Sequence, residues 1–224
     1  MTEHPAKFSD PIIFRLQEIC DEYCAHIYDA GEIPTVLDPF AGTGKIHSLR
    51  GVTTIGVELE PEWAEMHPCT EVGDATALRF TDHVLDAVIT SPTYGNRMAD
   101  HHVARDDSKR HTYTHAIGRS LHNNNSGAMQ WGCDYRDFHR KAWREAIRVV
   151  KEDGLLVINI SNHIRKGVEQ HVVEFHIKAL IEEGCRIEEV RRVATRRQKH
   201  GANGSARVDS EKIIIARTPT GEPT

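Results

Sequence analysis

The sequence predicts an α/β protein with a seven-stranded, mostly parallel sheet, an antiparallel last strand and helices on both faces. Short apolar segments alternate with segments of helical periodicity, which is typical of parallel sheets covered by helices. The segment 155–160 is apolar enough to be buried on both faces, as the inner strands of such sheets are. The last two strand segments have no helix between them, so they should pair antiparallel.

Each element follows from a local pattern. Asp10 and Pro11 suit the cap and first position of a helix, and apolar residues then recur at helical spacing as far as Ile27. Gly184 is the expected stop of the last helix. Strands are expected near 36–38, 53–58, 70–72, 85–90, 155–160, 186–196 and 211–217, and further helices near 61–63, 135–150 and 168–183.

Length and composition indicate one globular domain, residues 1–224, inside the cell. Hydrophobic residues are 39% and charged residues 27%, which excludes a disordered chain. No apolar run approaches the roughly 18 residues of a membrane span, and the N-terminus lacks a signal peptide. Five irregularly spaced cysteines favour a reducing compartment, so we expect a cytoplasmic protein without membrane contact. The 15 histidines are scattered, and we predict no metal site.

Residues 97–134 interrupt the alternation of strands and helices. This stretch contains five histidines, the run Asn123-Asn124-Asn125-Ser126-Gly127 and little periodicity. A long irregular segment in a compact domain is usually a functional lid or a disordered loop. We interpret it as an insertion that recognises the target or remains flexible.

Charge is unevenly distributed although the net charge is only −5. The segment 186–207 has seven basic residues against Glu188 and Glu189, a local charge of +5. Such a segment either binds a polyanion or is a solvated edge strand protected by charge. The nucleic-acid-binding candidates are Arg191, Arg192, Arg196, Arg197 and Lys199.

A glycine turn follows the strand at 36–38, and we expect it to open a helix. It reads Asp38-Pro39-Phe40-Ala41-Gly42-Thr43-Gly44, and its small residues allow a ligand close to the backbone N–H groups. His47 stands where a dinucleotide motif would have its third glycine, which argues against a nicotinamide-dependent oxidoreductase.

Polar residues also follow the next three strands. Glu58 ends the second strand, where an acid can accept hydrogen bonds from ribose hydroxyls. Asp74, after the third strand, could accept from an adenine amine. Ser91-Pro92-Thr93-Tyr94 follows the fourth strand and offers a hydroxyl beside a flat ring for stacking. The carboxyl ends of parallel strands form one crevice, so these residues should meet there.

Together these elements resemble the amino-methyltransferases of nucleic acids, which use S-adenosylmethionine to methylate cytosine N4 or adenine N6. The segment His4-Pro5-Ala6-Lys7-Phe8 is similar to the family's N-terminal cofactor motif, and 91–94 is similar to its catalytic (Asn/Asp/Ser)-Pro-Pro-(Tyr/Phe/Trp) tetrapeptide. The resemblance implies a Rossmann-like class I methyltransferase fold. It also implies cofactor contacts by Lys7, Phe8, Asp38, Pro39, Phe40, Ala41, Gly42, Thr43, Gly44, Glu58, Leu59, Asp74, Ala75 and Ser91.

The catalytic residues that the resemblance implies are Ser91, Pro92, Thr93 and Tyr94, with Thr93 in place of the usual second proline. A serine in first place favours cytosine N4 over adenine N6. The expected partner is DNA, or alternatively RNA, and without a separate recognition domain the protein reads a short target as a monomer or dimerises. Alternatives are methylation of an RNA base or a protein glutamine, or a non-catalytic module that binds cofactor or nucleic acid.

Overall fold

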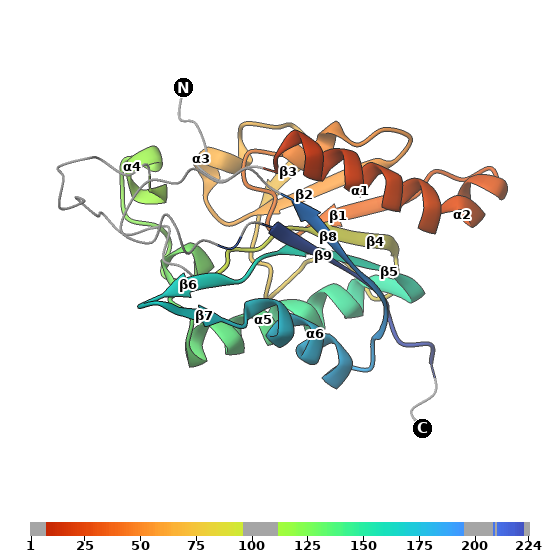
Figure 1. Cartoon of the computed structure of the whole chain (residues 1–224). Coiled ribbons are helices and arrows are strands. Elements are labelled where there is room, and N and C mark those ends of the chain that lie inside the picture. Colours follow the sequence, from red (N-terminus) through yellow and green to blue (C-terminus); the bar gives the residue numbers. More distant parts are fainter. Residues whose placement is uncertain (1–7, 96–111, 195–207, 209, 222–224) are drawn as a thin grey trace.

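The computed structural model describes residues 8–95, 112–194, 208 and 210–221. Its central sheet has the strand order β3-β2-β1-β4-β5-β9-β8, and Figure 1 shows helices above and below it. The strands are β1 (Thr35–Asp38), β2 (Thr53–Glu58), β3 (Thr70–Val72), β4 (Leu85–Thr90), β5 (Val150–Ile160), β8 (Arg186–Ala194) and β9 (Ser210–Arg217). The helices are α1 (Asp10–Tyr23), α2 (Ala25–Asp29), α3 (Pro61–Ala64), α4 (Tyr113–Ile117), α5 (Cys133–Val149) and α6 (Val172–Glu182).

The strand directions confirm the predicted topology. The neighbouring pairs among β3, β2, β1, β4 and β5 are parallel. Strand β9 pairs antiparallel with both β5 and β8. Because β9 runs in the opposite direction, its first residues lie at the same end of the sheet as the last residues of β4 and β5.

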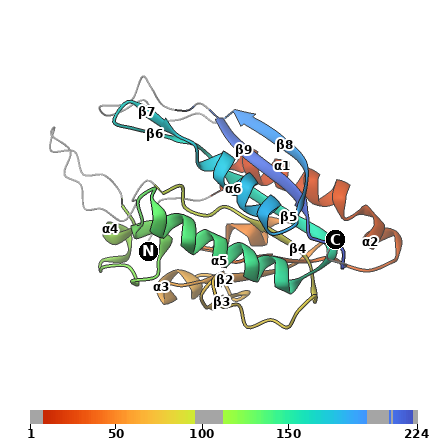
Figure 2. The same ribbon diagram turned by 90° about the horizontal axis from the view of Figure 1, so that it is seen from below.

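Alternating strand residues build a core on each face of the sheet. One set packs with α1, and it includes Val36, Ala87, Ile89, Leu155 and Val157. The other set packs with α5 and α6, which cross this face side by side in Figure 2, and it includes Leu37, Val88, Leu156 and Ile158. Strand β5 is buried from Leu155 to Ile160, as its composition predicts.

Three local predictions were wrong. The glycine turn leads into a single 3₁₀ turn, Lys45–Ser48, rather than an α-helix. The N-cap of α1 is Ser9, and Asp10 is already helical. The expected helix over 168–183 begins only at Val172, because 163–170 form a hairpin of β6 (His163–Arg165) and β7 (Val168–Gln170).

The hairpin turns at Lys166-Gly167, both with positive φ. Two such residues make the tight turn whose twist matches paired strands. A glycine after an exposed polar residue is a weak sequence signal, and the apolar residues beyond it hid the turn. Among the described residues no helix has the length and apolar character needed to cross a membrane.

Candidate active site

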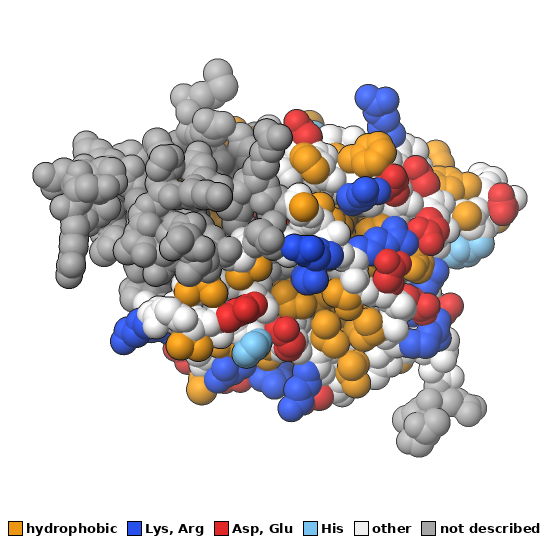
Figure 3. Space-filling view, viewed as in Figure 1, with side chains coloured by type: hydrophobic (Ala, Val, Ile, Leu, Met, Phe, Trp, Pro, Cys, Tyr) orange, Lys and Arg blue, Asp and Glu red, His pale blue; other side chains and the backbone are white. Residues whose placement is uncertain are grey.

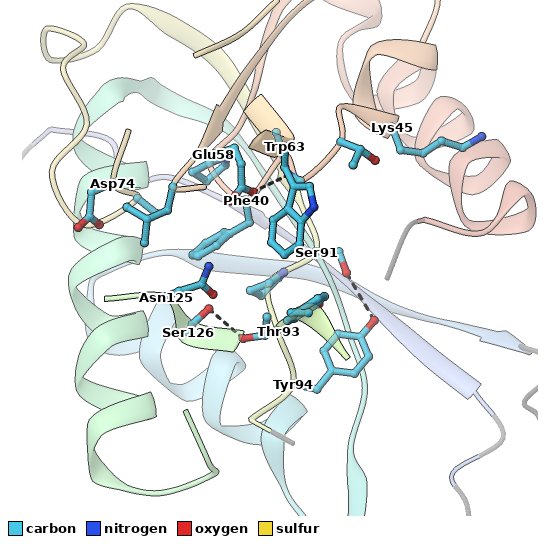
Figure 4. A pocket seen from close by; sticks show the side chains of 18 of the residues that line it. Phe40, Lys45, Glu58, Trp63, Asp74, Ser91, Thr93, Tyr94, Asn125 and Ser126 are labelled. Atoms are coloured by element: carbon cyan, nitrogen blue, oxygen red, sulfur yellow. Dashed lines mark hydrogen bonds between the residues drawn. The ribbon is translucent and has the colours of Figure 1, made fainter. Parts of the chain in front are cut away.

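A cavity of about 340 Å³ opens at the carboxyl ends of the parallel strands (Figure 4). The turns after β1 to β4 contribute most of its walls, as the polar residues at those strand ends predict. Segments far along the chain complete it. The lining residues are Phe8, Pro39, Phe40, Ala41, Gly42, Thr43, Lys45, Glu58, Leu59, Trp63, Gly73, Asp74, Ala75, Ser91, Pro92, Thr93, Tyr94, Tyr113, Asn124, Asn125, Ser126, Phe138, Asn159 and Glu211.

Asp38 forms hydrogen bonds that hold the glycine turn, and it does not line the cavity. Its carboxylate accepts hydrogen bonds from the Phe40 amide at 3.0 Å and the Thr90 hydroxyl at 2.5 Å. The side chain is fully buried, and burial raises its pKa to about 7. Asp38 therefore ties the turn to the neighbouring strand β4. Its predicted contact with a cofactor remains a prediction.

Glu58 lies at the end of β2 and faces the cavity. One carboxylate oxygen accepts from the Gly42 amide at 2.8 Å and the other from the Glu60 amide at 2.9 Å. Burial raises its pKa to about 7. A carboxylate has about four acceptor positions, so these two bonds leave capacity for a bound hydroxyl. The Gly42 bond also fixes the glycine turn against β2.

Gly44 does not line the cavity, although the resemblance places it in the cofactor loop. Its φ of +79° favours glycine, and an added Cβ would lie 2.8 Å from both His47 Cδ2 and His67 Cβ. The structure thus requires Gly44 for close packing of two histidines. Lys7 lies outside the described residues.

Among the described residues, His47, His67 and Cys69 form the one group whose ligand atoms lie close enough to hold a metal ion. However, the two imidazole rings are stacked 3.8 Å apart at 11°. A metal lies near the plane of each imidazole it binds, so these stacked rings cannot direct lone pairs at one ion. Both His47 nitrogens also contact hydroxyls, of Thr54 and Thr70, at 2.8 Å. These side chains are therefore arranged to pack against one another and not to bind a metal ion.

The described part of the predicted insertion, residues 112–134, forms one wall of the cavity. Buried Glu60 holds it, because its carboxylate accepts from the His122 amide and the Asn125 side chain, both at 2.8 Å. Arg119 forms ion pairs with Glu60 and Glu62. This part is therefore tethered to the end of β2. Residues 97–111 lie outside the described chain.

Asp74 lines the cavity after β3 and is held in a tight local turn. Its Oδ1 accepts from the amide and the hydroxyl of Thr76, and its Oδ2 accepts from Asn124. The bond to Asn124 brings the insertion onto the end of β3 as well. Asp74 thus faces the cavity where the resemblance implies an adenine, with acceptor atoms that are already oriented.

The tetrapeptide 91–94 lies opposite the glycine turn, and its hydroxyls meet two residues of other strands. Asn159 of β5 lies 3.3 Å from Ser91 Oγ and 3.4 Å from Tyr94 Oη, and it donates to Glu211 at 2.6 Å. Tyr94 Oη donates to the same Glu211 carboxylate at 3.3 Å. Because Asn159 Nδ2 faces the carboxylate, its Oδ1 points elsewhere, and this buried oxygen has no partner among the described residues. Figure 4 shows Tyr94 beside Ser91 in the cavity wall.

Sequence reasoning missed Asn159 and Glu211. Asn159 is a polar residue within the buried segment of β5, a signal that could have marked it. Glu211 is joined to Tyr94 across 117 positions, and only the antiparallel pairing of β9 with β5 brings it to the cavity. The aromatic lining residues Trp63, Tyr113 and Phe138 were also unassigned.

The basic segment is described only as far as β8. Arg191 pairs with Glu22 at 2.7 Å and with Glu189 at 2.8 Å. In the described part of the surface in Figure 3, Lys and Arg lie among Asp and Glu. Arg192 is exposed, whereas Arg196, Arg197 and Lys199 lie outside the described residues. Arg191 thus belongs to a paired surface, and its predicted phosphate contact is not supported by this arrangement.

Similar solved structures identify the fold. A SAM-dependent methyltransferase from Methanosarcina mazei matches with a TM-score of 0.55 and 12% identity, over 84% of this chain and 94% of that chain. A Haloferax volcanii methyltransferase in complex with the Trm112 methyltransferase activator matches with 0.52 and 13% identity, over 93% and 95%. The chain has the class I methyltransferase fold. This confirms the predicted fold class.

The fold alone does not assign the reaction. The [4+2]-cyclase SpnF matches with a TM-score of 0.56 and 14% identity, over 92% of this chain and 82% of that chain. No protein-family model and no curated protein sequence matches the chain. The reaction therefore depends on the residues of the cavity.

Proposed function

We propose that the protein transfers a methyl group from S-adenosylmethionine to an exocyclic amine of a DNA base, with cytosine N4 favoured over adenine N6. The observation that carries this proposal is the cluster of Ser91, Tyr94, Asn159 and Glu211 in the cavity wall. The hydroxyl and carboxylate oxygens of this cluster are hydrogen-bond acceptors, and they lie beside an aromatic ring. A planar ring that carries an amino group suits such a surface.

The other side of the cavity fits the cofactor. Small residues of the turn, Ala41 and Gly42, leave space next to the backbone, and Glu58 offers a carboxylate where ribose hydroxyls are expected. Phe40 and Phe8 add apolar surface. When bound, S-adenosylmethionine supplies an electrophilic methyl group. The chain's own contribution is to hold that group and the amine in one dry space.

The amine is a weak nucleophile because its lone pair is delocalised into the base. In this proposal, Ser91 Oγ and the Pro92 carbonyl accept its two hydrogens and favour a tetrahedral nitrogen. Tyr94 stacks on the base, which must be extruded from a duplex or already single-stranded. The bound donor would supply the methyl group to the amine nitrogen and keep the sulfur electron pair, and the amine would release one proton to solvent. Positioning supplies most of the acceleration.

A labelled methyl donor offered in parallel to DNA, RNA and protein tests this proposal. The wild type should label DNA, and sequencing of modified bases should find N4-methylcytosine. Ser91→Ala should label far less even at a donor concentration that saturates the variant. Labelling of RNA or protein alone would move the activity to the runner-up substrates, and donor binding without turnover on any polymer would indicate a non-catalytic module.

The DNA surface belongs to the same proposal. Arg192 and the segment with Arg196, Arg197 and Lys199 are the candidates for phosphate contacts. A cytoplasmic monomer or homodimer is expected, and sedimentation with and without a duplex would distinguish these two states.

A further inference from the structure

We infer that hydrogen bonds from Tyr135 and to Ser126 hold the catalytic loop at Thr93 and thereby replace the missing second proline of the tetrapeptide. This inference rests on the proposed function of the loop. It makes Tyr135, together with His176 behind it, a positioning residue rather than a catalytic one. Nothing in the sequence motif itself points to either side chain.

The hydrogen bonds behind Thr93 have one consistent direction. Trp143 Nε1 can only donate, so His176 Nδ1, 3.0 Å away, accepts. The His176 proton is then on Nε2, which lies 3.0 Å from Tyr135 Oη and donates to it. The Tyr135 hydroxyl donates in turn to the Thr93 carbonyl at 2.6 Å.

Burial keeps this chain of hydrogen bonds in a single state. Tyr135, Trp143 and His176 are all 0% exposed. Burial lowers the pKa of His176 well below its ordinary value, so the ring is neutral and holds one proton, as the chain requires. Water cannot replace a lost partner at these positions. Tyr135 and Trp143 come from α5 and His176 from α6, so two packed helices aim one hydroxyl at the loop.

The insertion holds the same loop from its other side. Thr93 Oγ1 donates to Ser126 Oγ at 2.8 Å, and the Trp131 amide donates to the Gly95 carbonyl at 2.7 Å. Figure 4 shows Ser126 and Thr93 facing one another. A threonine side chain can make such a bond and a proline cannot. The residue that breaks the motif therefore supplies its own anchor.

A second proline would restrain the same position of the loop, through the peptide unit that precedes residue 93. It would fix φ at position 93 and restrict the residue before it. In this chain, the bond to the Thr93 carbonyl restrains the peptide unit that follows Thr93, and the bond from the Thr93 hydroxyl to Ser126 restrains its side chain, so the loop is held at the same residue. Among the described residues the Thr93 amide donates no hydrogen bond, so a proline there would remove only the side-chain bond to Ser126.

The test is a cycle of Tyr135→Phe, Thr93→Pro and the double variant, with two readouts. One is kcat for methyl transfer at saturating donor and DNA, together with the Kd of the donor. The other is hydrogen exchange of the Tyr94 and Gly95 amides, which needs no activity. Tyr28→Phe, in α2 and outside the cavity lining, is the matched control.

We expect Tyr135→Phe alone to lower kcat about tenfold and to speed exchange about tenfold, with donor Kd unchanged, as for one lost buried hydrogen bond. In the Thr93→Pro background the same change should cost about twofold or less. Equal costs in both backgrounds, or no cost in either, would overturn the inference. If the wild type methylates nothing, the proposed function is wrong, and the exchange rates still decide this point.

If Thr93→Pro does not fold, Ser126→Ala replaces it in the cycle. Loss of two anchors that share one task should then exceed the product of the single losses. Independent effects of Ser126→Ala and Tyr135→Phe on exchange would contradict the inference.

Discussion

The two sides of the cavity are held together in different ways. On the side of the glycine turn, Asp38, Glu58 and Asp74 each accept from an amide two residues ahead. On the side of the tetrapeptide, Thr93 meets a residue 33 positions away and Tyr94 a residue 117 positions away. The first side combines these local turns with bonds to neighbouring strands and to the insertion. The second keeps its shape only when α5, α6, β5 and β9 are all packed, so remote substitutions should damage catalysis before they damage cofactor binding.

The largest expected effect comes from Tyr94→Ala. This change removes the stacking surface and the hydroxyl that contacts Glu211, so kcat/KM for DNA should fall by about a thousandfold. Donor Kd, measured by calorimetry, should stay within about twofold because the turn after β1 is untouched. A parallel loss of donor binding would show that the two sides are not independent.

Glu58→Gln probes the local side through stability. Burial raises the pKa of Glu58 to about 7, so the native state resists ionisation that the unfolded chain completes near its ordinary value. Wild-type stability therefore loses this contribution as pH rises from about 5 to 8. Over that pH range, the free energy of unfolding of the variant, measured in urea, should rise by about 3 kcal/mol relative to that of the wild type. Glu65→Gln, at an exposed position, is the control, and a pH-independent difference would contradict the assignment.

Asn125→Ala tests the segment that joins the two sides. It removes a donor to buried Glu60 and the cap of the Gly127 amide, bonds of 2.8 Å each. Stability should fall by about 1–3 kcal/mol, and both donor Kd and kcat should worsen. Asn123→Ala, two positions earlier and exposed, should change neither. If only donor Kd or only kcat changed, the segment would support only the corresponding side of the cavity.

The smallest effects concern phosphate contacts. Arg191→Gln should alter the salt dependence of DNA binding very little, because its charge is already paired with Glu22 and Glu189. Neutralising Arg196, Arg197 and Lys199 together should reduce the slope of log K against log salt by about 2–3. An unchanged slope in the triple variant would make these residues ordinary surface charges.

The sequence was informative where structure is local. Strand periodicity and the polar residues after each strand predicted the sheet, its antiparallel last strand and most of the glycine-turn side. The hairpin at 163–170 was missed because its turn has a weak signal. Asn159, Glu211 and Tyr135 were missed because tertiary packing alone brings them to the tetrapeptide. The sequence predicts a lid or a loop at 97–134, whereas residues 112–134 form one wall of the cavity. Glu60 holds this wall with its carboxylate oxygens, and nothing in the sequence around Glu60 indicates that it contacts this segment.

That wall has a consequence for the order of events in turnover. Asn125 donates to Glu60, on the side of the glycine turn, and Ser126, the next residue, accepts from Thr93 of the tetrapeptide. We therefore expect a molecule bound beside Glu58 to fix the conformation of residues 125–126 before a base binds. This favours an ordered kinetic scheme in which the donor binds first. Inhibition by the demethylated product should then be competitive against the donor and noncompetitive against DNA. A random binding order would mean that Asn125 and Ser126, although joined by one peptide bond, are held independently of each other.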